Sequence, residues 1–387
     1  MRMKTFLLGS AAALGVSGVA QAADLATVTY AEPVDYVRVC DAFGAGFYYI
    51  PGTDTCLRIG GYVRFQVEYG EDIYSHDAYV ENDQDDDFDN DIDNDDADDE
   101  ANDTTDWRYR VRASLDVTAS SQTDWGPLIG YMEFEANFGP GNDDVTWVEP
   151  QNAFVSLGPF TAGIYQSNFD TGGSYTSAYQ LDEGFGVGFT DDKTLQMQLS
   201  WAFNGFGIIL AAEDPNSRAG EDEWEDDSAQ GEIPDLVAAL TGEWGNLAAK
   251  VAFLYRDTDP DTSWGVQGNV TFSDLFGGLD LQLAGFWIDK GSLPCGGDPT
   301  CTISGWGTGD SWGGQASLRY DWTSMFNTSV TAQYVDYSSV GGADGWNFAF
   351  NADYKPVDDF LIRGAVRYLE FTDDWNALIE FRRSFGG

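Results

Sequence analysis

The chain has 387 residues, a formal net charge of −46 and one histidine. A length of this order often means two domains, but no Pro/Ser-rich linker divides the chain, and short alternating segments continue from about residue 60 to the end. We therefore expect one large β domain. With 65 acidic and 19 basic residues, the chain is not expected to bind nucleic acid.

The first 22 residues have the pattern of a secretory signal peptide. Arg2 and Lys4 precede an apolar run that ends in Ala20-Gln21-Ala22, which predicts cleavage after Ala22 and a single mature domain over 23–387. No later run approaches the ~20 apolar residues that a membrane helix needs. If the mature chain spans a membrane, it must do so with strands.

Four cysteines in an exported chain are more often paired than free. Four cysteines allow three pairings, and the two short separations favour Cys40 with Cys56 and Cys295 with Cys301. Neither spacing is typical of a zinc site.

Alternation of apolar and polar residues predicts sixteen strands. They are 60–70, 106–119, 127–138, 152–157, 160–166, 194–203, 206–214, 233–244, 247–257, 264–273, 279–290, 312–322, 327–337, 346–355, 360–371 and 376–385. Long connections follow the odd-numbered strands and short connections the even-numbered ones. This arrangement is typical of an outer-membrane barrel, whose short turns face the periplasm and whose long loops face outward.

Aromatic residues lie where apolar faces end, as in the girdles of membrane barrels. They are Trp107, Trp201, Trp264, Trp312, Trp346, Tyr354 and Phe371. The predicted fold class is therefore all-β: a transmembrane antiparallel barrel with sixteen strands, located in the bacterial outer membrane and in contact with its lipid.

Arginines gather on the inner face of four strands that barrel closure makes adjacent. Residues 106–119 alternate arginine with apolar residues, and the same parity turns arginines of the first, fifteenth and sixteenth strands inward. The expected pore-lining arginines are Arg64, Arg108, Arg110, Arg112, Arg363, Arg367 and Arg382. The alternative is a salt-bridge ladder on an exposed sheet face, each pair contributing about 0.2–1 kcal/mol.

The stretch DYVRVCDAFGAGFYYIPGTDTCLRIGGYVRF, residues 35–65, closely resembles the start of alphaproteobacterial general-diffusion porins. The resemblance continues more loosely through IPDLVAALTGEWG and WGVQGNVTFSD to EFRRSF. It implies a trimer of sixteen-stranded barrels in which the third external loop, here 166–193, folds into the lumen. Asp170, Asp182 and Glu183 are then candidates to face the arginines. The family usually ends on its last phenylalanine, whereas Gly386 and Gly387 follow Phe385 here.

Residues 71–105 form a strongly acidic stretch that is expected to be an external loop. Five acids fall at the ligand positions of an EF-hand calcium loop: Asp89, Asp91, Asp93, Asp95 and Glu100. Asn94 replaces the required glycine, so loose binding of divalent cations, or simple enrichment of cations at the channel mouth, is favoured over a true EF-hand. No cofactor is expected.

These patterns predict a passive channel for ions and small hydrophilic solutes. A substrate-specific or gated channel is the alternative. A barrel enzyme is disfavoured, because His76 lies in the acidic stretch and no G-x-S-x-G motif occurs. A soluble, secreted calcium-binding β-protein would be extracted without detergent.

Overall fold

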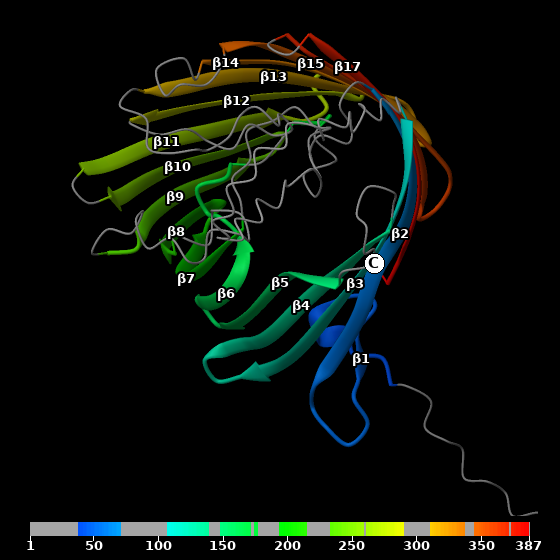
Figure 1. Cartoon of the computed structure of the whole chain (residues 1–387). Helices are drawn as coiled ribbons and strands as arrows, with labels where there is room; N and C mark the ends of the chain where they lie inside the picture. The colour runs from blue at the N-terminus through cyan, green and yellow to red at the C-terminus, as the bar shows by residue number, and fades with distance from the viewer. Residues whose placement is uncertain are drawn as a thin grey trace, which may run out of the picture. The chain divides into compact units, whose positions relative to one another are not determined.

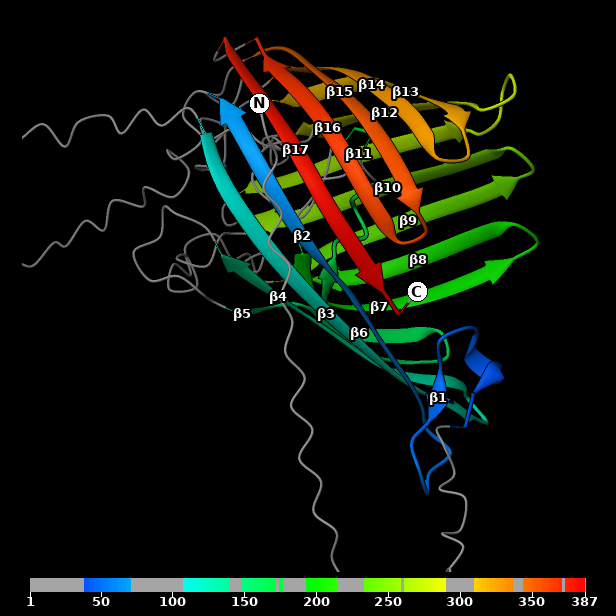
Figure 2. The same cartoon turned by 90° about the vertical axis from the view of Figure 1, so that its right-hand side faces the viewer.

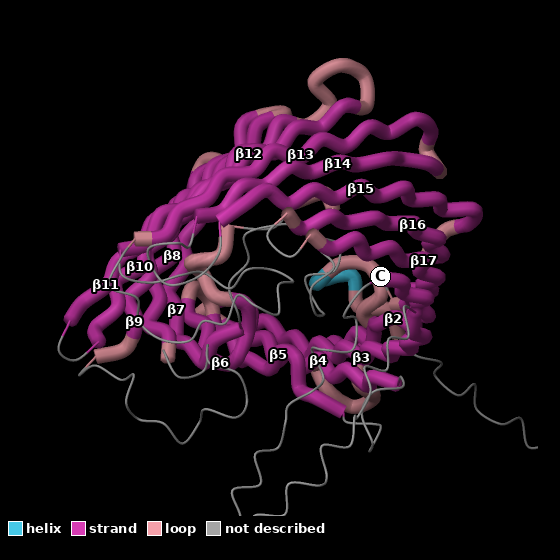
Figure 3. The backbone as a smooth tube through the Cα atoms, turned by 45° about the horizontal axis from the view of Figure 1, so that its top comes forward, coloured by secondary structure: helices cyan, strands magenta, loops and turns pink. Residues whose placement is uncertain are grey.

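Backbone pairing joins the strands of this chain in one antiparallel sheet that closes on itself. Within the described part of the chain, sixteen strands, β2 to β17, follow one another in sequence order, and β17 pairs with β2 to complete the ring. The closing pairs run from Asn376 opposite Gly70 to Phe385 opposite Gly61. Figures 1 and 2 show the ring from two directions, and Figure 3 shows β17, β2 and β3 side by side.

The structure is a computed structural model. It describes residues 38–70, 107–138, 148–171, 174–176, 193–214, 233–258, 261–289, 310–336, 344–370 and 373–386. The strands of the ring are β2 (Cys56–Gly70), β3 (Trp107–Thr123), β4 (Gly126–Phe138), β5 (Val148–Leu157), β6 (Phe160–Gln166), β7 (Lys193–Phe203), β8 (Phe206–Glu213), β9 (Asp235–Trp244), β10 (Leu247–Thr258), β11 (Asp261–Phe272), β12 (Leu279–Asp289), β13 (Ser311–Thr323), β14 (Phe326–Asp336), β15 (Asp344–Val357), β16 (Phe360–Leu369) and β17 (Asp374–Phe385). No helix within these ranges is long and apolar enough to span a membrane.

A short amino-terminal element is attached to the start of β2. The 3-10 helix η1 (Asp41–Phe43) leads to β1 (Tyr48–Tyr49), which pairs with the first residues of β2. A disulfide joins Cys40 to Cys56, and both cysteines are fully buried. This bond is one of the two predicted pairs.

The side chains of the ring alternate between an apolar outer face and a largely polar inner face, the reverse of a soluble protein. On β2, Val63 is 50% exposed and Phe65 is 38% exposed, whereas Arg64 between them is 1% exposed. A hydrocarbon environment outside the barrel makes this pattern favourable. Apolar side chains can be exposed to hydrocarbon without a cost in free energy, and the backbone N–H and C=O groups form their hydrogen bonds within the sheet.

Exposed aromatic side chains lie near the strand ends, as the sequence predicts. Neighbouring strands bring several rings together: Trp264 and Trp287 are 4.4 Å apart between centroids, and Tyr368 and Trp375 are 4.7 Å apart. The predicted girdle residues that are described are all exposed: Trp107, Trp201, Trp264, Trp312, Trp346 and Tyr354. Phe371 lies outside the described residues.

The short connections have the turn chemistry that the sequence indicates. At the β7–β8 turn, Asn204 has φ 49° and Gly205 has φ 80°, as an Asn-Gly hairpin requires.

Strand ends differ from the predictions. β2 begins at Cys56 rather than 60 and β3 continues to Thr123 rather than 119. β10 continues to Thr258 and β11 begins at Asp261, so both strands extend into the expected loop 257–263, of which 259–260 lie outside the described residues. Antiparallel partners continue to exchange backbone hydrogen bonds there, and this pairing does not depend on the apolar alternation that the sequence reading followed.

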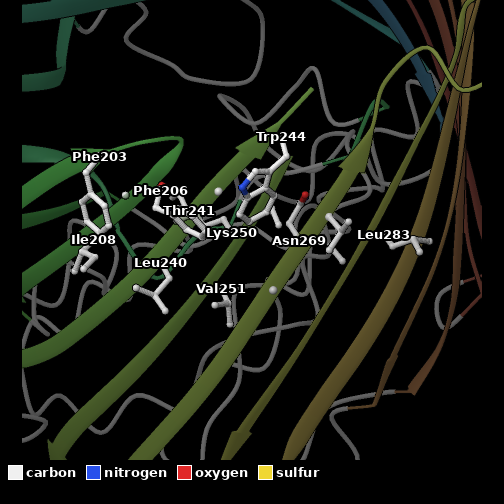
Figure 4. Close-up of a pocket in the computed structure, with 16 residues that line it drawn as sticks. Phe203, Phe206, Ile208, Leu240, Thr241, Trp244, Lys250, Val251, Asn269 and Leu283 are labelled. Atoms are coloured by element: carbon white, nitrogen blue, oxygen red, sulfur yellow. The ribbon is translucent and has the colours of Figure 1, made fainter. Parts of the chain in front are cut away.

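An apolar groove of about 660 Å³ crosses the outer face of β7 to β12 (Figure 4). Trp244, Phe206, Leu240 and Leu283, all at least 43% exposed, border it. It lies on the face away from the polar lining and contributes nothing to the inner site.

Leu199 and Gln198 are adjacent on β7 and lie on its outer and inner faces. We expect Leu199→Arg to destabilise the folded barrel by about 2–4 kcal/mol, the cost of a basic side chain in hydrocarbon. Gln198→Arg should cost much less. Urea unfolding in lipid vesicles measures both, and equal destabilisation would contradict the assignment of the two faces.

Candidate functional site

Three arginines lie in one row across β17, β2 and β3. Arg64 is directly opposite Arg382 on one side and Arg112 on the other. Arg64 and Arg112 are 1% and 2% exposed, and Arg382 is partly exposed. Like charges directly opposite each other destabilise a sheet, so neighbouring groups must compensate them.

Tyr62 and Glu135 supply much of this compensation. A buried ion pair of 2.5 Å links Arg112 Nη1 to Glu135 Oε2, and the Tyr62 hydroxyl donates to Glu135 Oε1 at 2.7 Å. The Tyr62 ring lies 5.8 Å from the guanidinium carbons of both Arg64 and Arg382, within the range of cation–π attraction.

The other inward arginines also have partners from the barrel wall. Arg363 forms a two-pronged pair with Asp353, with both N to O distances 2.6 Å. Arg367 donates to Asn376 Oδ1 at 2.8 Å. We call the group Arg64, Arg112, Arg363, Arg367 and Arg382 the arginine cluster.

Glu380 of β17 is an acidic partner of the arginine cluster. Its side chain is 0% exposed; it pairs with Arg382 at 3.3 Å and accepts a hydrogen bond of 3.1 Å from Gln66 Nε2. Alternation in the sequence predicts the inward arginines but does not identify Glu135, Asp353 and Glu380 as their partners. The sequence does contain one signal for these acids: strand alternation places their side chains on the same inner face as the arginines.

Two further predicted arginines lie on β3. Arg110 is half-buried. The backbone of Arg108 is opposite Glu68, and its side chain lies outside the described residues.

The chain that leaves β6 turns against the inner wall. Ser167 Oγ and the Asn168 backbone N–H donate to the two carboxylate oxygens of Glu213, at 2.7 and 2.9 Å. The Lys250 ammonium donates to the backbone oxygen of Asp170. Asp170 was predicted to face the arginines, but the structure places it beside Gln166 of β6 and Lys250 of β10.

Phe169 anchors this segment. It is 0% exposed and packs in a cluster that includes Leu254, Phe286 and Ile288. A Cβ added at Gly265 would lie 3.0 Å from Phe169 Cζ, so the glycine makes room for the ring. Simple alternation did not predict an apolar patch on the inner wall.

Residues 174–176 contact strands on another part of the ring. The Tyr175 N–H donates to Ser317 Oγ of β13 at 3.0 Å, and Thr176 Oγ1 donates to Thr331 Oγ1 of β14 at 2.7 Å. Asn351 of β15 donates to the Thr176 carbonyl at 3.3 Å. β14 is eight strands from β6 in either direction around the ring, so residues 174–176 contact a part of the ring that is remote from β6.

The remaining predicted features lie outside the described residues. They are the signal peptide 1–22, the acidic loop 71–105 with Asp89, Asp91, Asp93, Asp95 and Glu100, the cysteines Cys295 and Cys301, and the acids Asp182 and Glu183. Within the ranges that the structure describes, no three His, Cys, Asp or Glu side chains are placed to hold a metal ion.

Comparisons with known proteins agree with this architecture. A family model described as the porin subfamily matches residues 24–384. The chain is 30% identical over 404 residues to porin Omp2b of Brucella suis biovar 1 (strain 1330), with 100% of this chain and 98% of the relative covered. It is 30% identical over 410 residues to porin Omp2a of Brucella melitensis biotype 1, with the same shares covered.

Solved structures share the fold. The outer-membrane channel DcaP of Acinetobacter baumannii matches with a TM-score of 0.62 at 15% identity, over 87% of this chain and 99% of that one. A mutant of Rh. blastica porin matches with a TM-score of 0.52 at 12% identity, over 85% of this chain and 100% of that one. The closed barrel with its polar lining, together with these relatives, shows that the chain belongs to the porin subfamily and is an outer-membrane channel rather than an enzyme.

Proposed function

We propose that this porin is a passive channel for ions and small hydrophilic solutes, and that the arginine cluster lines its narrowest part. The third external loop, 166–193, would form the opposite side of that constriction. The observation that carries the proposal is the row Arg382, Arg64 and Arg112, which lies in register on the inner face of three adjacent strands. The contacts of residues 174–176 with β13 to β15 support the position of the loop.

Charge pairing limits the preference of the cluster for anions. Glu135, Asp353 and Glu380 neutralise much of the positive charge at short range. The net charge of −46 lies largely elsewhere, with a dense block in the acidic loop 71–105. That loop is proposed to concentrate cations at the external mouth and to bind divalent cations loosely.

We further propose that the channel assembles as a homotrimer, as the resemblance to general-diffusion porins implies. Single-channel currents that close in three equal steps would support this assembly, and single-step closure would exclude three conducting barrels.

The salt dependence of selectivity tests the overall proposal. We expect the purified porin in a planar bilayer to prefer cations at low ionic strength and to lose this preference as salt screens the loops, because the Debye length falls from about 30 Å at 0.01 M to about 3 Å at 1 M. Reversal potentials under a salt gradient measure it. Equal anion and cation permeability at low salt would contradict control by the loops.

Removing one buried carboxylate should expose the charge of the arginines. We expect Glu135→Gln to raise the chloride-to-potassium permeability ratio by about twofold to threefold, because Arg112 loses its counter-charge. Glu135→Asp is the control, since it keeps the charge. An unchanged ratio in Glu135→Gln would place the arginine cluster outside the permeation path.

A cross-link tests the position of the third loop. The hydroxyl oxygens of Thr176 and Thr331 are 2.7 Å apart, so Thr176→Cys with Thr331→Cys should form a disulfide under oxidising conditions. Thr176→Cys with Val330→Cys should not, because Val330 is the next residue on β14, is 45% exposed and lies on the outer face. Mass spectrometry of proteolytic fragments distinguishes the pairs. Cross-linking of neither pair would contradict the proposed loop position.

A further inference from the structure

Three aromatic side chains lie together on the inner face of β4, β5 and β6. Tyr131 and Phe154 are stacked, with ring centroids 5.1 Å apart and an interplanar angle of 25°. Phe154 and Tyr165 are 5.4 Å apart at 65°, edge to face. Each of the three residues is only partly buried. Their rings therefore form an apolar surface beside the lumen, in which one pair is stacked and the other is edge to face.

Strand register explains why these rings meet. Tyr131 is directly opposite Phe154, and Phe154 is directly opposite Gly163 of β6. A Cβ at Gly163 would lie 2.6 Å from Phe154 Cβ and 2.2 Å from the Ala153 carbonyl oxygen, so any residue other than glycine would clash with β5 at this position. Val155, the next residue on β5, is 50% exposed on the outer face.

Glu133 lies next to this surface. Its carboxylate accepts hydrogen bonds from the Asn152 side chain at 2.7 Å, the Tyr131 hydroxyl at 3.1 Å and the Ser114 hydroxyl at 3.3 Å. All three donors are neutral. A register shift between Glu133 and Phe134 marks a bulge on β5, and the pairing places Asn152 opposite Glu133.

Glu133 differs in this respect from the neighbouring inward acid Glu135. Glu135, two residues further along β4, forms a 2.5 Å ion pair with Arg112, whereas Glu133 forms no ion pair among the described residues. Asp116, opposite Glu133 on β3, adds a second carboxylate, and its nearest cation is Arg58 at 4.0 Å. The site therefore carries more negative than positive charge.

A carboxylate beside aromatic faces is suited to an organic cation. Aromatic rings attract ammonium groups through their negative faces, and quaternary ammonium ions are recognised in this way. A hard metal ion would need six or more oxygen ligands, and a neutral solute would gain nothing from the charge of Glu133. We propose that Tyr131, Phe154, Tyr165 and Glu133 form a lumenal binding site for alkylammonium cations.

The proposal requires conduction through the barrel but does not depend on the role of the arginine cluster. It is tested with choline and its neutral carbon analogue 3,3-dimethyl-1-butanol, each added to the purified channel in a planar bilayer in potassium chloride. We expect choline to reduce the current in a saturable way and the neutral analogue not to do so. Equal effects of both probes, or a choline effect that does not saturate, would overturn the proposal.

Matched variants assign the effect to the site. We expect Glu133→Gln to raise the half-blocking choline concentration by about tenfold and Phe154→Leu by about threefold or more. Glu243→Gln, the same change at an exposed position near the β9–β10 turn, should leave it unchanged. An unchanged value in Glu133→Gln would exclude the site.

Conductance in potassium chloride without a probe is measured first for every protein. Its absence in the wild type would contradict channel function itself, whereas conductance without block contradicts only the cation site. If Phe154→Leu does not fold, the near-isosteric Glu133→Gln and the comparison of the two probes still decide the outcome.

Discussion

The structure depends on one constraint: every backbone N–H and C=O within hydrocarbon must find its partner inside the protein. A sheet meets this constraint only by closing, and the β17–β2 pairing, from Asn376 and Gly70 to Phe385 and Gly61, leaves the ring without an edge strand. Closure also gives the sheet an inside and an outside. Alternate residues of each strand then meet lipid or the lumen, so Arg64 is buried between the exposed neighbours Val63 and Phe65.

Closure makes the ends of the sequence neighbours and thereby concentrates positive charge. Arg64 of the first strand of the ring lies between Arg382 of the last strand and Arg112 of the second. The barrel tolerates this row because Glu135, Glu380 and the ring of Tyr62 lie among the guanidinium groups. Removing one partner of a buried pair leaves an uncompensated charge. The electrical character of this wall therefore comes from the paired acids as much as from the arginines.

The inner wall is not uniformly polar. Phe169 packs in an apolar cluster, and residues 174–176 form hydrogen bonds with polar side chains of β13 to β15. Together they attach the chain after β6 at two separated places on the ring. A third region, on β4 to β6, brings aromatic rings beside the carboxylate of Glu133, which accepts hydrogen bonds from neutral donors. The inner wall therefore has regions of different chemistry at different places on the ring.

The sequence by itself determined the barrel, its sixteen strands and the inward direction of the arginines, because period-two alternation and turn residues are local signals. It also indicated the Cys40–Cys56 bond, which joins neighbouring segments. Only the tertiary structure decided which acid faces which arginine, since Glu135 and Arg112 meet through strand register. It likewise decided that Asp170 lies beside Lys250. It also decided that Phe169 packs against Leu254, Phe286 and Ile288 in an apolar cluster. The contacts of Phe169 and Asp170 join segments far apart in the chain, and alternation specifies the face on which a residue lies but not which residues it contacts.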